Sequence, residues 1–287
     1  ANKKTISSFG ESKSDYDIFS CLADKLGFLN SFTENKSELD WLKYLWDESK
    51  KVSEKMNLKL PEFDKFWEDG FFEVPIERTK KIMFKDFRDN PRINALNTPS
   101  GKIEITSNII KNYNLKDCKG HPTWIEPYEW LGRKENFPLH LISNQPEYRL
   151  HGQLDNAEYS LKNKIKDREP VLINIEDAKE RNIENNDVVL IFNKRGRVLA
   201  GARLSDEIMR GVLVLSTGAW FDPDYEINTD LHGNPNVLTK DIGTSQLSQA
   251  PTSHTCLVEI RKAEKSEIKK VKIFLKPKIQ KKLEQKY

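Results

Sequence analysis

The clearest signal of a fold lies in residues 171–215, which read VLINIEDAKERNIENNDVVLIFNKRGRVLAGARLSDEIMRGVLVL. Short apolar runs alternate with turn-forming residues, and this pattern predicts strands at 171–173, 187–192, 198–204 and 212–215. An asparagine followed by acidic residues after the first run predicts the start of one short helix. Many short strands with a single helix indicate a compact, barrel-like domain.

The flanking sequence extends this domain and adds a helical part before it. Apolar runs at 139–142 and 257–260 predict two further strands, so the β domain is expected to begin at Phe137 and to close with the strand at 257–260. Residues 1–70 predict three helices, because two serine-led capping patterns and one proline each precede apolar residues at helical spacing. The fold class is therefore expected to be mixed α+β, with a mainly helical N-terminal part followed by a β-barrel.

Specific residues mark those helices. Ser14 and Ser37 are predicted to cap the first two helices, and Pro61 to open the third, which Gly70 ends. The aromatic side chains of this part sit at packing positions, which favours a core role over a ligand-binding one. Residues 71–135 are interrupted by prolines and indicate a connector, with one short strand predicted at 102–106.

Charge is concentrated at the C-terminus. The net charge is +3, yet residues 262–287 hold ten lysines and three glutamates, about +7, which leaves the body of the chain at about −4. A basic nucleic-acid-binding body is therefore not expected. Residues 263–287 are interpreted as a lysine-rich, solvated tail, with contact to a membrane surface or a partner as the alternative.

The common site motifs are absent. The sequence has no GxSxG, GxGxxG or GxxxxGK[ST] motif, and its five histidines show no HExxH spacing, so a zinc site made by the protein is not expected. Its three cysteines are far apart and are expected to be reduced, mostly buried thiols. No run of about 18 apolar residues predicts a membrane span. The first residues, Ala1 to Thr5, indicate neither a Met start nor a signal peptide.

Two loops instead concentrate small polar residues. The first loop, residues 143–153, reads SNQPEYRLHGQ and directly follows a predicted strand. The second loop, residues 232–249, reads HGNPNVLTKDIGTSQLSQ, and it is longer than most loops that only connect elements. Amide, hydroxyl, imidazole and guanidinium groups in such loops suit a large heteroaromatic ligand. An ordinary polar loop and a structural turn are the alternatives, and Trp220, on pattern alone, favours a core position.

These segments resemble, in order, the end of a known enzyme family. Residues 217–223 (TGAWFDP), 232–239, 243–245 and 247–249 closely resemble the last domain of the dimethyl-sulfoxide, trimethylamine-N-oxide and biotin-sulfoxide reductases of the molybdopterin oxidoreductases. Segments at 14–19, 98–104, 138–153 and 169–174 agree as well. One such motif is weak evidence, whereas an ordered set across residues 9–262 is strong.

The resemblance implies a fold, a cofactor and a set of contacts. Residues 136–262 would form a double-psi-like β-barrel that caps the cofactor, and residues 1–135 would be the trailing part of upstream α/β domains plus the connector. The cofactor would be bis-molybdopterin guanine dinucleotide with molybdenum, with tungsten as the alternative metal. By position, the expected cofactor-binding residues are Ser143, Gln145, His151, Gln153, Asn234, Asn236, Thr239 and Gln249, with Arg149 and Trp220 as second choices.

Two departures from the family pattern matter. Gly152 stands where the family usually has a serine, which removes one hydroxyl contact. The serine that ligates the metal in this family lies far upstream of the matching region. The resemblance therefore implies no catalytic residue and no metal ligand in this chain.

The expected whole enzyme would reduce a small S-oxide or N-oxide. Its partners would be the missing N-terminal domains and an unidentified electron donor, with no nucleic acid and no membrane span. The periplasm is the expected compartment, with the cytoplasm as the alternative. A stand-alone cofactor-binding subunit and a non-catalytic β-barrel interaction module, with the tail as its docking arm, remain the alternative functions.

Overall fold

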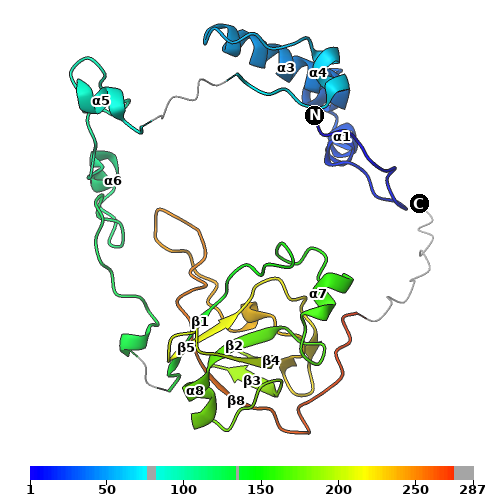
Figure 1. The fold of residues 1–287 in the computed structure, drawn as a ribbon, viewed down its shortest axis with the longest axis vertical. Helices are drawn as coiled ribbons and strands as arrows, with labels where there is room; N and C mark the ends of the chain where they lie inside the picture. Colours follow the sequence, from blue (N-terminus) through cyan, green and yellow to red (C-terminus); the bar gives the residue numbers. More distant parts are fainter. Residues whose placement is uncertain (76–81, 134–135, 275–287) are drawn as a thin grey trace. The chain divides into compact units, whose positions relative to one another are not determined.

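The chain forms two compact units, Ala1–Asn90 and Pro91–Tyr287, in a computed structural model that describes residues 1–75, 82–133 and 136–274. The first unit is helical among its described residues. Its helices are α1 (Asp15–Lys25), α2 (Leu29–Thr33), α3 (Glu38–Glu54), α4 (Phe63–Asp69) and α5 (Lys85–Asp89) (Figure 1).

The helix starts follow the sequence closely. Ser37 and Asp40 form a complete capping box at α3, whereas at α1 the Ser14 side chain accepts a hydrogen bond from the amide of Asp17. Pro61 precedes the N-cap residue Glu62, so it lies just outside α4 and does not occupy its first turn. Gly70 ends α4 with φ 84°, a conformation that glycine adopts without strain.

The apolar side chains of the first unit are only partly covered. Trp46 and Phe66 stack with ring centroids 3.9 Å apart, and Trp46 donates a hydrogen bond to the Pro61 carbonyl. Phe19 and Leu22 on α1 remain 54% and 49% exposed. The apolar core expected from helical spacing is therefore only partly formed within this unit. The sequence pattern was correct for the helices and wrong for the degree of burial.

The second unit begins with the connector, here residues 91–133. It holds α6 (Asn108–Asn112) and the short 3-10 helix η1 (Leu131–Arg133). The strand predicted at 102–106 is absent, because no neighbouring strand pairs with it and its apolar residues Ile103 and Ile105 point to solvent.

A closed barrel follows the connector. Its strands run in the order β2-β5-β1-β8-β3-β4, and a β2–β4 pairing closes the ring. Pairs β1–β5 and β2–β4 are parallel and the other ring pairs are antiparallel. The strands are β1 (Leu139–Ile142), β2 (Pro170–Asn174), β3 (Val188–Phe192), β4 (Arg197–Ser205), β5 (Val212–Leu215) and β8 (Leu257–Lys262).

The barrel's additional elements are short. They are α7 (Glu158–Lys162), α8 (Ile175–Glu180), the two-residue strands β6 (Pro223–Asp224) and β7 (Thr229–Asp230), and the 3-10 helix η2 (Pro235–Val237) (Figure 1). Asn174 caps α8 by accepting a hydrogen bond from the amide of Glu176, as predicted. The predicted mixed α+β class, with helices followed by a barrel, is confirmed.

The core lies inside the barrel. Leu141, Ile173, Ile191 and Leu213 are fully buried there, and β1 and β5 place Leu141 beside Leu213 in register. The barrel therefore gives the loops at its strand ends a rigid base.

The segment after β8 also packs. Ala263 and Val271 are buried against Leu190 and Leu199, and the Asp222 carboxylate accepts hydrogen bonds from the amides of Lys272 and Ile273. Packing thus continues through Phe274, where the sequence predicted a solvated tail. The rest of that predicted tail, 275–287, lies outside the described residues.

Two expectations about composition can be compared with the structure. Cys256 is buried, but Cys118 is partly exposed and Cys21 is exposed, so the expected burial of most thiols is wrong. Across the described ranges, no helix is long and apolar enough to cross a membrane.

Candidate functional site

The first loop, residues 143–153, presents polar side chains to the surface. Gln145, His151 and Gln153 are exposed, and neither His151 nor Gln153 hydrogen-bonds through its side chain to any described residue. Ser143 lies at the root of the loop, where its hydroxyl is buried and has no partner among the described residues. Free hydrogen-bonding groups on a rigid base are typical of a ligand-binding surface.

The backbone of this loop is fixed by the turn at residues 217–220. His151 has φ 49°, an unusual value for a non-glycine residue, and its carbonyl accepts a hydrogen bond from Arg149 Nε at 3.2 Å. A Cβ atom on Gly218 would lie 1.9 Å from that carbonyl oxygen, so only glycine fits there. Trp220 Nε1 donates to the Gly152 carbonyl at 2.6 Å.

A cluster of buried charges underlies both loops; we call its members Arg149, Asp155, Lys164 and Glu169 the buried charge cluster. Their side chains are at most 2% exposed. Arg149 Nη1 lies 3.0 Å from Glu169 Oε2, and Lys164 Nζ lies 2.6 Å from Asp155 Oδ1 and 2.9 Å from Glu169 Oε2. Two positive and two negative charges balance, as buried ions require.

The cluster is also tied to the backbone around it. Arg149 Nη2 donates to the Thr217 carbonyl, and the Trp220 amide donates to Asp155 Oδ2 at 3.0 Å. Burial alone would raise the pKa of Asp155, but Lys164 and the Trp220 amide outweigh this effect and hold that pKa below its ordinary value. Burial and Glu169 raise the pKa of Tyr148, whose hydroxyl donates a hydrogen bond to Glu169.

The second loop, residues 232–249, starts from the same region. The Asp230 carboxylate accepts hydrogen bonds from the amides of His232, Gly233 and Asn234, at 3.3, 2.9 and 2.8 Å. The His232 carbonyl accepts the amide of Glu169, which joins the loop directly to the buried charge cluster. The buried charge cluster is therefore tied to both loops, to the first through Arg149 and to the second through His232.

His232 is fully buried beside that cluster. Burial, followed by the charge of Lys164, lowers its pKa, so the ring is neutral near pH 7. Nδ1 lies 3.0 Å from the Trp220 carbonyl, which can only accept, so Nδ1 carries the proton. Nε2 has no partner among the described residues, and the ring meets Phe274 edge-on at 4.7 Å.

The structure separates the predicted contacts into two groups. It brings His151 and Trp220 together through Gly152, and it roots Asn234 on Asp230, close to the buried charge cluster. Asn236 and Thr239 follow on η2 and just after it, where Thr239 Oγ1 donates to the Asn236 carbonyl. Gln249 belongs to the segment that a bridge between Gly243 and Pro251 closes, and this orange segment projects from the barrel (Figure 1).

Arg149 occupies a different environment from an exposed contact. Its guanidinium is inside the buried charge cluster, so it supports the first loop from below and does not present donors at the surface. Trp220 is half-buried, and its indole N–H is already engaged by Gly152. Arg149 and Trp220 therefore hold the backbone of the first loop in this structure, through hydrogen bonds to the carbonyls of His151 and Gly152.

Sequence reasoning missed the residues that hold the loops. Asp155, Lys164, Glu169 and Asp230 were not among the predicted residues, because a linear sequence does not show which charges are buried together. The signal that remains is weak: the sequence EPVLIN at 169–174 places Glu169 directly before a strand that is buried.

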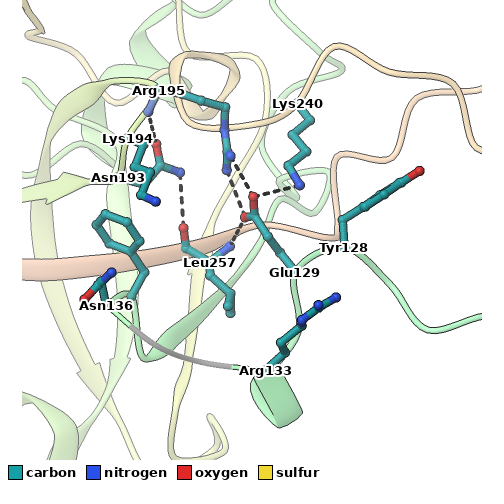
Figure 2. Close-up of a pocket in the computed structure, with 10 residues that line it drawn as sticks. Tyr128, Glu129, Arg133, Asn136, Asn193, Lys194, Arg195, Lys240 and Leu257 are labelled. Carbon is teal, nitrogen blue, oxygen red and sulfur yellow. Dashed lines mark hydrogen bonds and ion pairs between the residues drawn. The ribbon is translucent and has the colours of Figure 1, made fainter.

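A cavity of about 250 Å³ lies elsewhere, between the connector and the barrel. Figure 2 shows the Glu129 carboxylate at its side, facing Arg195 and Lys240 and meeting the amide of Leu257. Burial would raise the pKa of Glu129, but Arg195, the Leu257 amide and Lys240 bring that pKa to about 2. None of the predicted contact residues lines this cavity.

The sequence of this chain matches a family model and several known proteins. Residues 139–257 match the family model described as "Molydopterin dinucleotide binding domain". The chain is 43% identical to the trimethylamine-N-oxide reductase of Haemophilus influenzae, covering 88% of this chain and 32% of that protein. It is 41% identical to a biotin sulfoxide reductase of Cereibacter sphaeroides, covering 90% of this chain and 34% of that protein.

A further relative and a solved structure agree. The dimethyl sulfoxide/trimethylamine N-oxide reductase of Cereibacter sphaeroides is 40% identical over 91% of this chain and 32% of its own length. The acetylene hydratase of Pelobacter acetylenicus matches in structure with a TM-score of 0.66 at 15% identity, over 91% of this chain and 34% of that one. The chain spans about a third of these relatives, and the structural match shows the fold alone.

Proposed function

This chain belongs with the C-terminal part of the molybdopterin-containing N-oxide and S-oxide reductases, and we propose that it forms one wall of the cofactor site in such a reductase. The observation that carries the proposal is the identity of 40–43% to three such reductases along about nine tenths of the chain. The cofactor we propose is bis-molybdopterin guanine dinucleotide with molybdenum.

The residues present fit such a group. A pterin has a rim of nitrogen and oxygen atoms that needs donors and acceptors when it is buried. The first loop offers the unpartnered side chains of His151 and Gln153, and Ser143 keeps a buried hydroxyl without a partner among the described residues. In the second loop, the side-chain oxygen of Asn234 accepts a hydrogen bond from the Asn236 amide, and its NH₂ group remains available to a ligand.

The roles of these residues follow from their positions. When bound, the molybdenum cofactor supplies two-electron redox chemistry and oxygen-atom transfer. Asn234, Asn236 and Thr239 would hydrogen-bond the ligand from the second loop, and His151 and Gln153 from the first. The buried charge cluster and Asp230 keep both loops in place, which lowers the entropic cost of ordering them on binding.

The metal ligand and the groups that act on the oxide belong, in this proposal, to residues outside this chain. This assignment rests on the relatives, which are about three times as long as the matched region. The chain contributes orientation and shielding of the ligand from water, and the substrate is a small S-oxide or N-oxide.

The test uses the full-length protein in its metal-loaded form. With a reduced viologen dye as donor, we expect turnover of trimethylamine N-oxide, dimethyl sulfoxide or biotin sulfoxide. The doubly substituted protein Asn234→Ala and His151→Ala should lose much of this activity and bind less pterin, while its thermal unfolding stays close to wild type. A wild-type protein that contains no pterin and reduces none of these oxides would contradict the proposal.

A further inference from the structure

The second loop is fixed at two points by the connector, which lies more than a hundred residues earlier in the sequence. At the first point, Glu129 Oε1 lies 2.9 Å from Lys240 Nζ. Lys240 directly follows Thr239, one of the residues proposed to bind the cofactor. At the second point, the Gln246 amide donates to the Asp117 carboxylate at 3.0 and 3.2 Å.

The first point is a carboxylate with four donors around it. Besides Lys240, Glu129 receives two hydrogen bonds from Arg195, at 2.7 and 3.0 Å, and one from the Leu257 amide at 2.8 Å (Figure 2). Arg195 in turn donates through Nε to the Leu238 carbonyl at 2.7 Å, which lies inside the second loop. Glu129 thus acts on the loop through Lys240 directly and through Arg195 indirectly.

The second point is reciprocal. While Asp117 accepts the Gln246 amide, the Gln246 side-chain oxygen accepts the amide of Lys116 at 3.2 Å. The loop residues between Lys240 and Gln246 are largely exposed, and their hydrogen bonds to described residues run within residues 242–252. The connector therefore supplies restraints that the barrel does not.

We propose that Glu129 and Asp117 are positioning residues, which hold the second loop in the shape that ligand binding by Thr239 requires. This inference rests on the proposed function, because it takes the second loop to be part of the cofactor site. Neither residue would touch the ligand. Their effect passes through Lys240, Leu238 and Gln246.

The test is hydrogen exchange of the full-length protein, followed by mass spectrometry, on peptides covering residues 238–252. We expect Glu129→Gln to speed amide exchange there by about tenfold, since charge-assisted hydrogen bonds to the loop are lost. Asp117→Asn should act mainly around Gln246 and serves as the second variant if Glu129→Gln does not fold. The same proteins are then assayed for loss of molybdenum and pterin over time.

Glu259→Gln is the matched control. Glu259 pairs with Arg181 at 2.7 Å and accepts a backbone amide, much as Glu129 does, but it has no contact with the second loop. It should leave exchange at 238–252 unchanged. Lys240→Met should reproduce part of the effect of Glu129→Gln, and the double variant should show less than the sum of the two.

The outcomes separate the two proposals. Faster loop exchange together with faster cofactor loss, in both connector variants and not in the control, supports the positioning role. Unchanged exchange overturns it, and so does faster exchange with unchanged cofactor loss. Failure of the proposed function itself would appear in the wild-type protein, as an absence of pterin before any substitution is made.

Discussion

Glu169 connects the two loops at the scale of a single residue. It pairs with Arg149 and Lys164, accepts a hydrogen bond from the Tyr148 hydroxyl, and has a side chain that is 0% exposed. Glu169→Gln leaves the cluster with one uncompensated positive charge in a buried site. We expect the free energy of unfolding to fall by about 3–5 kcal/mol, measured by urea denaturation.

The matched control for that substitution is Glu158→Gln. Glu158 pairs with Lys162 on the surface of α7, and its side chain is 83% exposed. Its loss should change the free energy of unfolding by no more than about 0.5 kcal/mol. Equal losses in the two variants would mean that the buried charge cluster does not hold the loops as described.

Gly218 makes a second prediction at this scale. It has φ 92°, and a Cβ atom there would overlap the His151 carbonyl. Gly218→Ala should lower the free energy of unfolding by about 2–4 kcal/mol and disturb the first loop. The comparison is Gly152→Ser, whose Cβ would lie 3.3 Å from Trp220 Nε1 and should cost within about 1 kcal/mol. Thermal unfolding of both variants tests this: Gly218→Ala should unfold at a clearly lower temperature than wild type, and Gly152→Ser at nearly the wild-type temperature.

At the scale of elements, the segment after β8 packs against the closed barrel. Phe274 packs on His232 and Trp220 at ring distances of 4.7 and 5.9 Å. Phe274→Ala should lower the free energy of unfolding by about 1–2 kcal/mol, since a half-buried ring loses these contacts. Tyr225→Ala, at a residue that is 85% exposed, is the control and should have little effect. No difference between the two would favour the solvated tail expected from sequence.

The contact between connector and barrel should depend on pH. The folded-state pKa of Glu129, about 2, lies below its ordinary value of 4.5, so its stabilisation is fully present above about pH 4.5. That stabilisation is lost as the pH falls from about 4.5 towards 2. The gap in free energy of unfolding between wild type and Glu129→Gln should therefore be about 1–2 kcal/mol at pH 6 and shrink by pH 3. A gap that does not change with pH would contradict this assignment.

For the whole molecule, local sequence patterns predicted the elements well and their assembly less well. The strands at 188–192 and 212–215 were predictable, because apolar runs between turn residues encode them locally. The strand predicted at 102–106 failed, because pairing depends on a partner that the alternating pattern does not specify. The capping residues Ser37 and Asn174 were correct, since a cap is a contact between neighbours.

The candidate site follows the same rule. Its loops were visible in the sequence as polar stretches between strands, and their surface residues His151, Gln153 and Asn236 are exposed as a ligand-binding role needs. The residues beneath them were not visible, because Asp155 and Glu169 meet Lys164 only after the barrel closes. The ion pair between Glu129 and Lys240 joins residues that are 111 positions apart, so no local sequence pattern could predict it.

The most direct measurement is the cofactor content of the purified full-length protein, by metal analysis and by quantifying guanosine monophosphate released with acid. The account predicts one molybdenum and two guanine nucleotides per molecule in the wild type. It also predicts a marked loss of both in the Asn234→Ala and His151→Ala protein, with its fold intact by circular dichroism. A folded wild-type protein with neither metal nor nucleotide, or a doubly substituted protein with undiminished content, would contradict the claim that these two loops hold the cofactor.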